Sequence, residues 1–378
     1  MKKYLYLTAL LAFSLVSCNA GKQQAATPVE KSDSVHEQVS LKYAQGIKLN
    51  YQGNTCLVTM QDPEDNKVLD YRFALVKRGE DAQIPEGYTR IDLPVRSTIC
   101  MTSLQLSNFI KLNELEHIVG ITSTKHLFNE EVHQRINDGK IQKIGIEGNF
   151  DNEVILGINP DIIMISPFKR GGFDALKDAG IPLIPHLGYK ELTPLGQAEW
   201  IKFVGLLLGE EKKATEIFDE IEKKYNDLKS LAQNVDSRPT VFSGELHGGN
   251  WYVVGGRSFL AQLFKDAGAD YIFKDDNSTG GVNLEYELVY AKAAHAQYWR
   301  ILNSHKGTFT YDALRESDAR YGDFDACKNQ GVIYCNMTKT PFYESMPVEP
   351  HLILADFLKI FHPELVPEHT PKYYSLLK

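Results

Sequence analysis

Hydroxyl, aromatic, amide and cationic side chains follow several apolar segments of this sequence, at the points where those segments are expected to end as strands. In open α/β sheets, ligands bind outside the carboxyl ends of the strands, so these side chains are candidates for a binding site. We predict ligand contacts from Thr102, Ser103, Arg170, Tyr189, His247, Trp251, Asn303 and Asn336. Aromatic faces supply contact area and cations pair with carboxylates, so the set favours a large planar or acidic ligand.

A purely structural role is the alternative for each of these residues. Tyr189 and Trp251 also suit packing between two lobes, because Tyr and Trp most often serve as packing residues. Lys169 and Arg170 also suit a solvated loop.

A bare metal ion is a second kind of ligand that the sequence allows. His126, His186 and His247 could converge on zinc or manganese, since imidazole is a frequent zinc ligand. Such a site normally adds an acidic ligand, and the sequence has no His-rich loop. We therefore rank a metal-ion site below a chelate and predict no protein-held metal or cofactor.

A hydrolase is the competing class. It would need a nucleophile beside a base, such as a serine on a GxSxG turn after a strand. The closest segment is Phe242-Ser243-Gly244-Glu245, which lacks the preceding glycine. The sequence therefore predicts a binding protein and not an enzyme.

The periodicity of apolar residues divides the chain into two α/β lobes. Strands alternate with helices over residues 97–193 and again over 236–378, which predicts two doubly wound lobes with mostly parallel sheets. Residues 194–235 contain no strand pattern, and a helix from Glu210 to Leu231 would reach about 33 Å at 1.5 Å per residue. We expect one long helix to join the lobes, and a small β extension over residues 41–96.

Each predicted lobe carries a glutamate at the start of a short helix that leads into a strand. In the first lobe this is Glu153, and in the second it is Glu287, with Glu285 as the fallback. A carboxylate in a first helical turn is stabilised by the helix dipole, which explains one such residue but not a matched pair.

The N-terminus has the pattern of an export signal. Lys2 and Lys3 precede an apolar run too short to span a membrane, and the run ends in Leu15-Val16-Ser17-Cys18, which closely resembles the bacterial lipobox. We predict a signal peptide over residues 1–18, lipidation of Cys18, and a flexible tether over residues 19–40, whose polar composition cannot bury enough surface to fold.

Charge and cysteine content narrow the remaining possibilities. The formal net charge is -8, so nucleic acid is not an expected partner. In an oxidising compartment Cys56 could pair with Cys100, and Cys327 with Cys335, although four buried thiols fit the sequence equally well.

Several motifs, and the order in which they occur along the chain, resemble one family. It is the family of substrate-binding proteins of ABC importers for iron-siderophores, haem or cobalamin, in a Bacteroidetes-type branch. The resemblance extends from about residue 97 to the C-terminus, and it rests on Gly145 and Glu153 before NPDII at 159–163, PLGQAEWIKF at 194–203, DAGADY at 266–271, and LILADF at 352–357 with HPEL at 362–365. The chain departs from the branch at AQYW (296–299) and at the loop before the last helix, so the resemblance does not choose the ligand.

The resemblance implies a function and a set of partners. A monomeric periplasmic receptor, lipid-anchored to a membrane, would capture an iron or cobalt chelate and deliver it to a permease dimer with its ATPase. In that family a glutamate on each lobe docks onto arginine pockets of the two permease subunits. The matching residues here are Glu153 and Glu287.

The lipid anchor gives the first testable prediction. Replacing Cys18 with Ser removes the thiol that would be acylated, so the full-length variant should fold normally and move from the membrane fraction to the soluble fraction. Ser17→Ala, which keeps the cysteine and a small residue before it, serves as the control. A Cys18→Ser protein that stays in the membrane fraction would contradict the anchor.

Overall fold

A computed structural model describes residues 38–146, 149–166 and 173–378 of the chain. The described residues belong to one compact unit. The predicted lipidation site Cys18 and the predicted ligand residue Arg170 lie outside the described residues. Among the residues that are described, no helix combines the length and the apolar character needed to cross a membrane.

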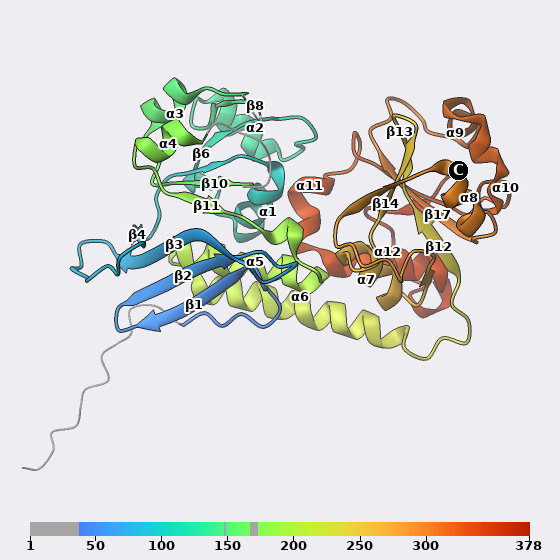
Figure 1. Ribbon diagram of the computed structural model, residues 1–378, viewed down its shortest axis with the longest axis horizontal. Helices are drawn as coiled ribbons and strands as arrows, with labels where there is room; N and C mark the ends of the chain where they lie inside the picture. The colour runs from blue at the N-terminus through green and yellow to red at the C-terminus, as the bar shows by residue number, and fades with distance from the viewer. Residues whose placement is uncertain (1–37, 147–148, 167–172) are drawn as a thin grey trace, which may run out of the picture. The chain divides into compact units, whose positions relative to one another are not determined.

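The N-terminal extension is a four-stranded sheet (Figure 1). Its strands, in sheet order, are β1 (Ile47–Gln52), β2 (Thr55–Gln61), β3 (Val68–Lys77) and β4 (Thr89–Leu93). The first three are antiparallel neighbours, and β4 runs parallel to β3. Apolar side chains such as Val58, Met60 and Phe73 are buried and join the main core of the molecule.

The first lobe is built on a parallel sheet in the order β11-β10-β5-β6-β7. Its strands are β5 (Thr98–Cys100), β6 (Ile118–Ile121), β7 (Gln142–Lys143), β10 (Ile162–Ile165) and β11 (Leu183–Pro185), and its helices are α1 (Ser103–Leu112), α2 (Glu130–Asn137), α3 (Asn152–Ile158) and α4 (Asp174–Asp178). A short hairpin, β8 (Gly145–Ile146) with β9 (Asn149–Phe150), precedes α3.

Side chains of β10 show that both faces of this sheet are covered. Ile162 and Met164 belong to the main core that includes α1, whereas Ile163 and Ile165 belong to a second core with Ile155 of α3 and Leu176 of α4. Because successive side chains of a strand point to opposite faces, a strand buried on both faces must be apolar throughout, as β10 is.

The second lobe contains a sheet in the order β15-β12-β17-β18-β19 and a three-stranded sheet in the order β13-β14-β16. Its strands are β12 (Thr240–Ser243), β13 (Glu245–His247), β14 (Asn250–Val254), β15 (Asp270–Tyr271), β16 (Gly281–Leu284), β17 (Tyr298–Asn303), β18 (Val332–Asn336) and β19 (Ser375–Leu376). Its helices are α7 (Phe259–Asp266), α8 (Tyr286–Ala293), α9 (Tyr311–Ser317), α10 (Asp325–Lys328), α11 (Phe342–Ser345) and α12 (Pro350–Phe361). All pairs of the larger sheet are parallel except β18 with β19.

Two consecutive helices connect the lobes. α5 (Pro194–Leu208) begins after Thr193, whose side chain accepts a hydrogen bond from the Gly196 amide, and it ends at Gly209 in a left-handed conformation. α6 (Glu211–Leu231) buries one stripe, including Ala214, Phe218, Ile221 and Tyr225. It packs against α5 and also against α12 of the second lobe, as Figure 1 shows. The predicted architecture of two α/β lobes, one long helix and a β extension is confirmed.

Two buried glutamates attach the start of the β extension to the linking helices. Glu199, which is 0% exposed, accepts hydrogen bonds from the backbone amides of Lys42, Tyr43 and Ala44 at 2.6–2.9 Å. Glu191 accepts hydrogen bonds from the amides of residues 45 and 46 and from the indole of Trp200. A buried carboxylate is tolerated only when such donors surround it.

A segment of the second half of the chain also packs directly onto the first lobe. α11 and the following 3-10 helix, Met346–Val348, contact α1. At the same place Glu344 accepts a hydrogen bond of 2.7 Å from the Phe128 amide, and burial raises the pKa of this carboxyl group. The two lobes are therefore joined by side-chain contacts as well as by α6.

The four cysteines of the described residues are free and buried. Burial raises the pKa of the Cys56 and Cys335 thiols to about 11, so both remain protonated at neutral pH. The structure therefore agrees with the alternative of four buried thiols and contains neither proposed disulfide.

Candidate functional site

A cavity of about 510 Å³ is lined by residues from both lobes. From the first lobe, Thr102 follows β5, Ser166 follows β10, and Tyr189 lies in the 3-10 helix Gly188–Lys190 that follows β11. These positions are the carboxyl ends of three adjacent parallel strands, the edge at which ligands bind in open α/β sheets. The volume falls within the range of about 300–1,000 Å³ that small-molecule sites occupy.

The second lobe supplies an apolar and aromatic wall. Its residues come from the three-stranded sheet, β17, α7, α11, the 3-10 helix after α11, α12 and the residue before β19, and they include Tyr252, Val254, Leu260, Leu263, Leu302, Phe342, Tyr343, Met346, Ile353 and Tyr374. Gly281 of β16 allows the Tyr252 ring to lie against the sheet, because a methyl group at this glycine would be only 1.9 Å from the ring. The wall therefore suits a ligand with a large apolar surface.

One cation lies in this wall. Arg300 is on β17, lines the cavity, and is only 8% exposed. Its Nε donates a hydrogen bond of 3.0 Å to the Tyr374 hydroxyl, and its guanidinium lies 5.1 Å from the centre of the Tyr374 ring. Arginine keeps its charge under all ordinary conditions, so the cavity is electropositive at this point.

Two of the residues predicted from the sequence line this cavity, Thr102 and Tyr189. Thr102 is also the N-cap residue of α1, where Gln105 completes a capping box. Ser103 lies beside a smaller recess next to Thr122 and Leu127 and does not line the cavity. The proposed role of Arg170 lies outside the residues that the structure describes.

Trp251 requires a correction, because its side chain is in the core. It is 0% exposed, its Nε1 donates to the Ser243 carbonyl at 3.1 Å, and its ring packs against Phe242, Trp299 and Phe324. Side chains alternate along a strand, so with Trp251 inward the next residue, Tyr252, faces the cavity. Tyr252 therefore replaces Trp251 in the candidate site.

The remaining predicted ligand residues of the second lobe also lie elsewhere. Asn303 donates to Glu245 Oε1 at 3.1 Å and accepts from the Tyr334 hydroxyl at 2.9 Å. Asn336 donates to the His305 carbonyl at 2.9 Å. His247 is exposed at the end of β13. The side-chain amides of Asn303 and Asn336 are thus both used in hydrogen bonds within the protein.

The three histidines proposed for a metal ion do not form a ligand group within the described residues. His186 is buried, its Nε2 lies 3.0 Å from the amide nitrogen of Asn108, and its ring lies 4.6 Å from that of Trp200. His126 Nε2 lies 3.2 Å from Ser304 Oγ, while His247 is exposed. The structure gives no support to a metal ion held by these residues.

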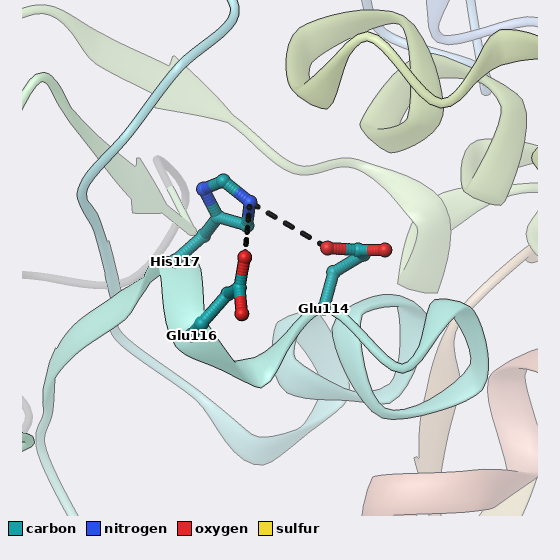
Figure 2. Close-up of side chains that lie close together, drawn as sticks. All are labelled: Glu114, Glu116 and His117. Atoms are coloured by element: carbon teal, nitrogen blue, oxygen red, sulfur yellow. Dashed lines mark ion pairs between the residues drawn. The ribbon is translucent and has the colours of Figure 1, made fainter.

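A different group of possible metal ligands is Glu114, Glu116 and His117 (Figure 2). His117 Nε2 lies 3.5 Å from Glu114 and 3.8 Å from Glu116, but the ammonium group of Lys213 already pairs with Glu114 at 2.7 Å. The group lies just before β6, at the amino end of the sheet and away from the edge where ligands bind. We therefore read it as an ion-pair cluster.

Ser243 does not have the surroundings of a nucleophile. It is 0% exposed, and its hydroxyl lies 3.3 Å from the hydroxyl of Tyr271. No described histidine is its hydrogen-bond partner.

Glu153 and Glu287 occupy the same position in equivalent helices. Each is the second residue of its helix, and each is exposed. α3 leads into β10, which pairs with β5, the first strand of its lobe; α8 leads into β17, which pairs with β12, the first strand of the other lobe. Capping of α3 is performed by Asp151, whose side chain accepts from the Val154 amide at 3.1 Å.

This geometry identifies the better partner for Glu153 in the second lobe. Glu285 is the N-cap residue of α8 and thus corresponds to Asp151, whereas Glu287 corresponds to Glu153. Because Asp151 already caps α3, capping does not explain Glu153.

The sequence interpretation missed Arg300, Tyr252 and Tyr374. A signal for Arg300 was present, since an arginine inside the apolar run "YWRIL" must be either partnered or functional. Tyr374 gave no such signal, because its place depends on the pairing of β19 with β18.

Comparison with known proteins identifies the family. Residues 99–337, more than half of the chain, match the family model described as periplasmic binding protein, and the chain therefore belongs to that family of binding proteins, which are not enzymes. An uncharacterized lipoprotein of Methanocaldococcus jannaschii is 26% identical over 351 residues, covering 86% of this chain and 82% of the relative.

Solved structures show the same fold. A periplasmic binding protein from Veillonella parvula aligns with a TM-score of 0.60 at 14% identity, covering 82% of this chain and 99% of that chain. A periplasmic heme binding protein from Pseudomonas aeruginosa aligns with a TM-score of 0.58 at 17% identity, covering 75% and 98%.

His186 gives a prediction for the pH dependence of stability. Burial lowers its pKa to about 4 from an ordinary 6.5, so between these values the unfolded chain binds a proton that the folded protein does not. The free energy of unfolding should fall by about 3 kcal/mol from this group as the pH is lowered through that window. His186→Gln keeps an acceptor for Asn108 and removes the titration.

Urea denaturation at pH 7 and pH 4.5 measures this effect. The wild type should lose more stability between the two pH values than His186→Gln, and the difference isolates His186 because His351, whose pKa burial also lowers to about 4, is present in both proteins. Equal losses in the two proteins would contradict the assignment.

Proposed function

We propose that this protein is the lipid-anchored receptor of an ABC importer and that it captures a metal chelate, such as an iron-siderophore, haem or cobalamin, for delivery to a membrane permease. The observation that carries the proposal is the cavity: it collects residues at the strand ends of the first lobe and an aromatic wall with a buried guanidinium from the second. A cavity of this composition suits a ligand with a planar or apolar body.

The likeness to other proteins supports the same proposal. The chain belongs to the periplasmic binding protein family, and a heme binding protein is among the structures that share its fold. Two relatives from Methanocaldococcus jannaschii are named lipoproteins, which agrees with lipidation at Cys18 and with a tether that keeps the receptor near its importer.

The identity of the ligand can be tested by the co-elution of coloured chelates with the protein. Purified protein is mixed with haemin, ferric siderophores of the hydroxamate and catecholate types, or cyanocobalamin, and passed over a sizing column. We expect one class of chelate to elute with the protein at a stoichiometry near one. Retention of none of them would contradict the proposal, and stoichiometric zinc in the same protein would favour a metal-ion receptor.

We further propose that Glu153 and Glu287 dock the receptor onto two basic pockets of a permease dimer. Supporting this role, the two exposed carboxylates occupy matching positions on the two lobes. Each also has an exposed apolar side chain three residues later, Leu156 and Tyr290, which lies on the same helix face. Exposed ion pairs contribute little individually, about 0 to 1 kcal/mol, but a pair of them sets orientation and capture rate.

Charge reversal tests the docking pair. Glu153→Arg combined with Glu287→Arg should abolish uptake and complex formation with the permease and leave ligand affinity unchanged, because like charges would then meet at both contacts. A matched control is Glu130→Arg with Asp312→Arg, which reverses exposed first-turn carboxylates on α2 and α9. Normal uptake by the first double variant, or lost ligand binding, would exclude this role.

A further inference from the structure

Arg300 is a buried cation without an ion-pair partner among the described residues. At 8% exposure its side chain is removed from bulk water, yet no carboxylate among the described residues lies within ion-pair distance of it. Its hydrogen-bond partner is the Tyr374 hydroxyl, which accepts one hydrogen bond from Nε and another from a terminal nitrogen, Nη2. The other terminal nitrogen, Nη1, has no protein partner within the described part of the chain, and the residue lines the cavity.

The described groups around this guanidinium form no direct ion pair with it. Phenol side chains surround it, from Tyr374 and from Tyr343, and burial raises the pKa of both, so they stay neutral. Glu245 interacts electrostatically with Arg300, but it is not within ion-pair distance, and its carboxylate accepts a hydrogen bond from Asn303. A buried charge without a counter-ion is strongly unfavourable, so the cavity is prepared for an anion.

The orientation of Arg300 is maintained by a chain of contacts from the C-terminus. Asp356, which is 0% exposed, accepts hydrogen bonds from the backbone amides of Tyr373 and Tyr374 at 2.7 and 2.9 Å and from His369 at 2.7 Å. These bonds fix Tyr374, whose hydroxyl then occupies one edge of the guanidinium. The other terminal nitrogen is not engaged by Tyr374, and Arg300 lines the cavity.

We propose that the ligand of this receptor is an anionic chelate with an apolar body, and that a free carboxylate on it pairs with Arg300. This inference rests on the proposed function and narrows its ligand class. A carboxylate supplies two acceptor oxygens for the remaining donors of Arg300, and charge-assisted bonds of this kind are the strong ones. A small inorganic anion would not use the wall formed by Leu260, Leu263 and Ile353, which the apolar body of the chelate covers.

Four chelates test the inference on the unmodified protein by quenching of tryptophan fluorescence. Haemin and ferric citrate carry free carboxylates, whereas ferrichrome and cyanocobalamin do not. We expect haemin, which combines carboxylates with an apolar ring, to bind tightly, and we expect weaker binding of ferric citrate, which lacks the apolar body, and of the two chelates without carboxylates. If haemin binds, its dimethyl ester should bind at least tenfold less tightly, because esterification removes the charges and leaves the ring.

Variants of the arginine give an independent test. Arg300→Gln should weaken binding of the carboxylate chelate on the order of 10- to 100-fold, the loss expected for a hydrogen bond to a charged group, and Arg300→Lys should weaken it less. Arg315→Gln, an exposed arginine paired with Asp312, is the matched control and should bind normally. Thermal unfolding checks that each variant is folded. If Arg300→Gln does not fold, the binding of the four chelates to the unmodified protein decides whether the ligand needs a free carboxylate.

The outcomes separate this inference from the proposed function. Binding of ferrichrome or cyanocobalamin alone, or unchanged affinity in folded Arg300→Gln, would overturn the anionic ligand and leave a chelate receptor in place. Binding of none of the four, nor of a ferric catecholate siderophore added as a fifth ligand, would overturn both.

Discussion

The burial of α5 is the constraint on which the rest of the structure depends. Every residue of this helix is buried, so it is surrounded by protein on all sides, and a helix of this kind forms the centre of a core and not its surface. The polar residues that it carries must therefore find partners, and Glu199 does so by accepting three backbone amides from the start of the β extension and by pairing with Lys202 at 3.2 Å. α6 packs against α5 along its apolar stripe and continues to α12.

The candidate site follows from this arrangement. With both lobes attached to α5 and α6, the carboxyl ends of β5, β10 and β11 line the same cavity as α7, the three-stranded sheet and β17 of the second lobe. α11 and residues 346–348 also contact α1. The relative position of the two lobes therefore depends on these contacts as well as on the linking helices. Arg300 is held at the wall of the cavity by its hydrogen bonds to the Tyr374 hydroxyl.

The architecture was readable from the sequence, whereas most of the site was not. Strand and helix periods and the strand-free stretch of residues 194–235 are local signals, and the structure has the lobes and the long helix that they predict. The face to which a strand side chain points is not local: the pairing of β14 with β16 decides that Trp251 is in the core and Tyr252 at the cavity. Asn303 and Asn336 stand at the correct strand ends, but their amides are satisfied within the protein. Tyr374 lies beside Arg300 because the C-terminal strand β19 pairs with β18. No sequence pattern predicts this strand pairing.

The linking helices and the contacts between the lobes hold the cavity in nearly one shape. The ligand therefore enters a site that is largely formed before binding. Closing the lobes further would require breaking the hydrogen-bond ladder of α6 or separating α11 from α1, whereas receptors that close by a hinge rotate about a few loop residues. Small-angle X-ray scattering from the ligand-free protein and from the protein saturated with the chelate that it retains tests this directly. The account predicts curves that superimpose, with the same radius of gyration; a clear decrease in the radius of gyration on loading would contradict it.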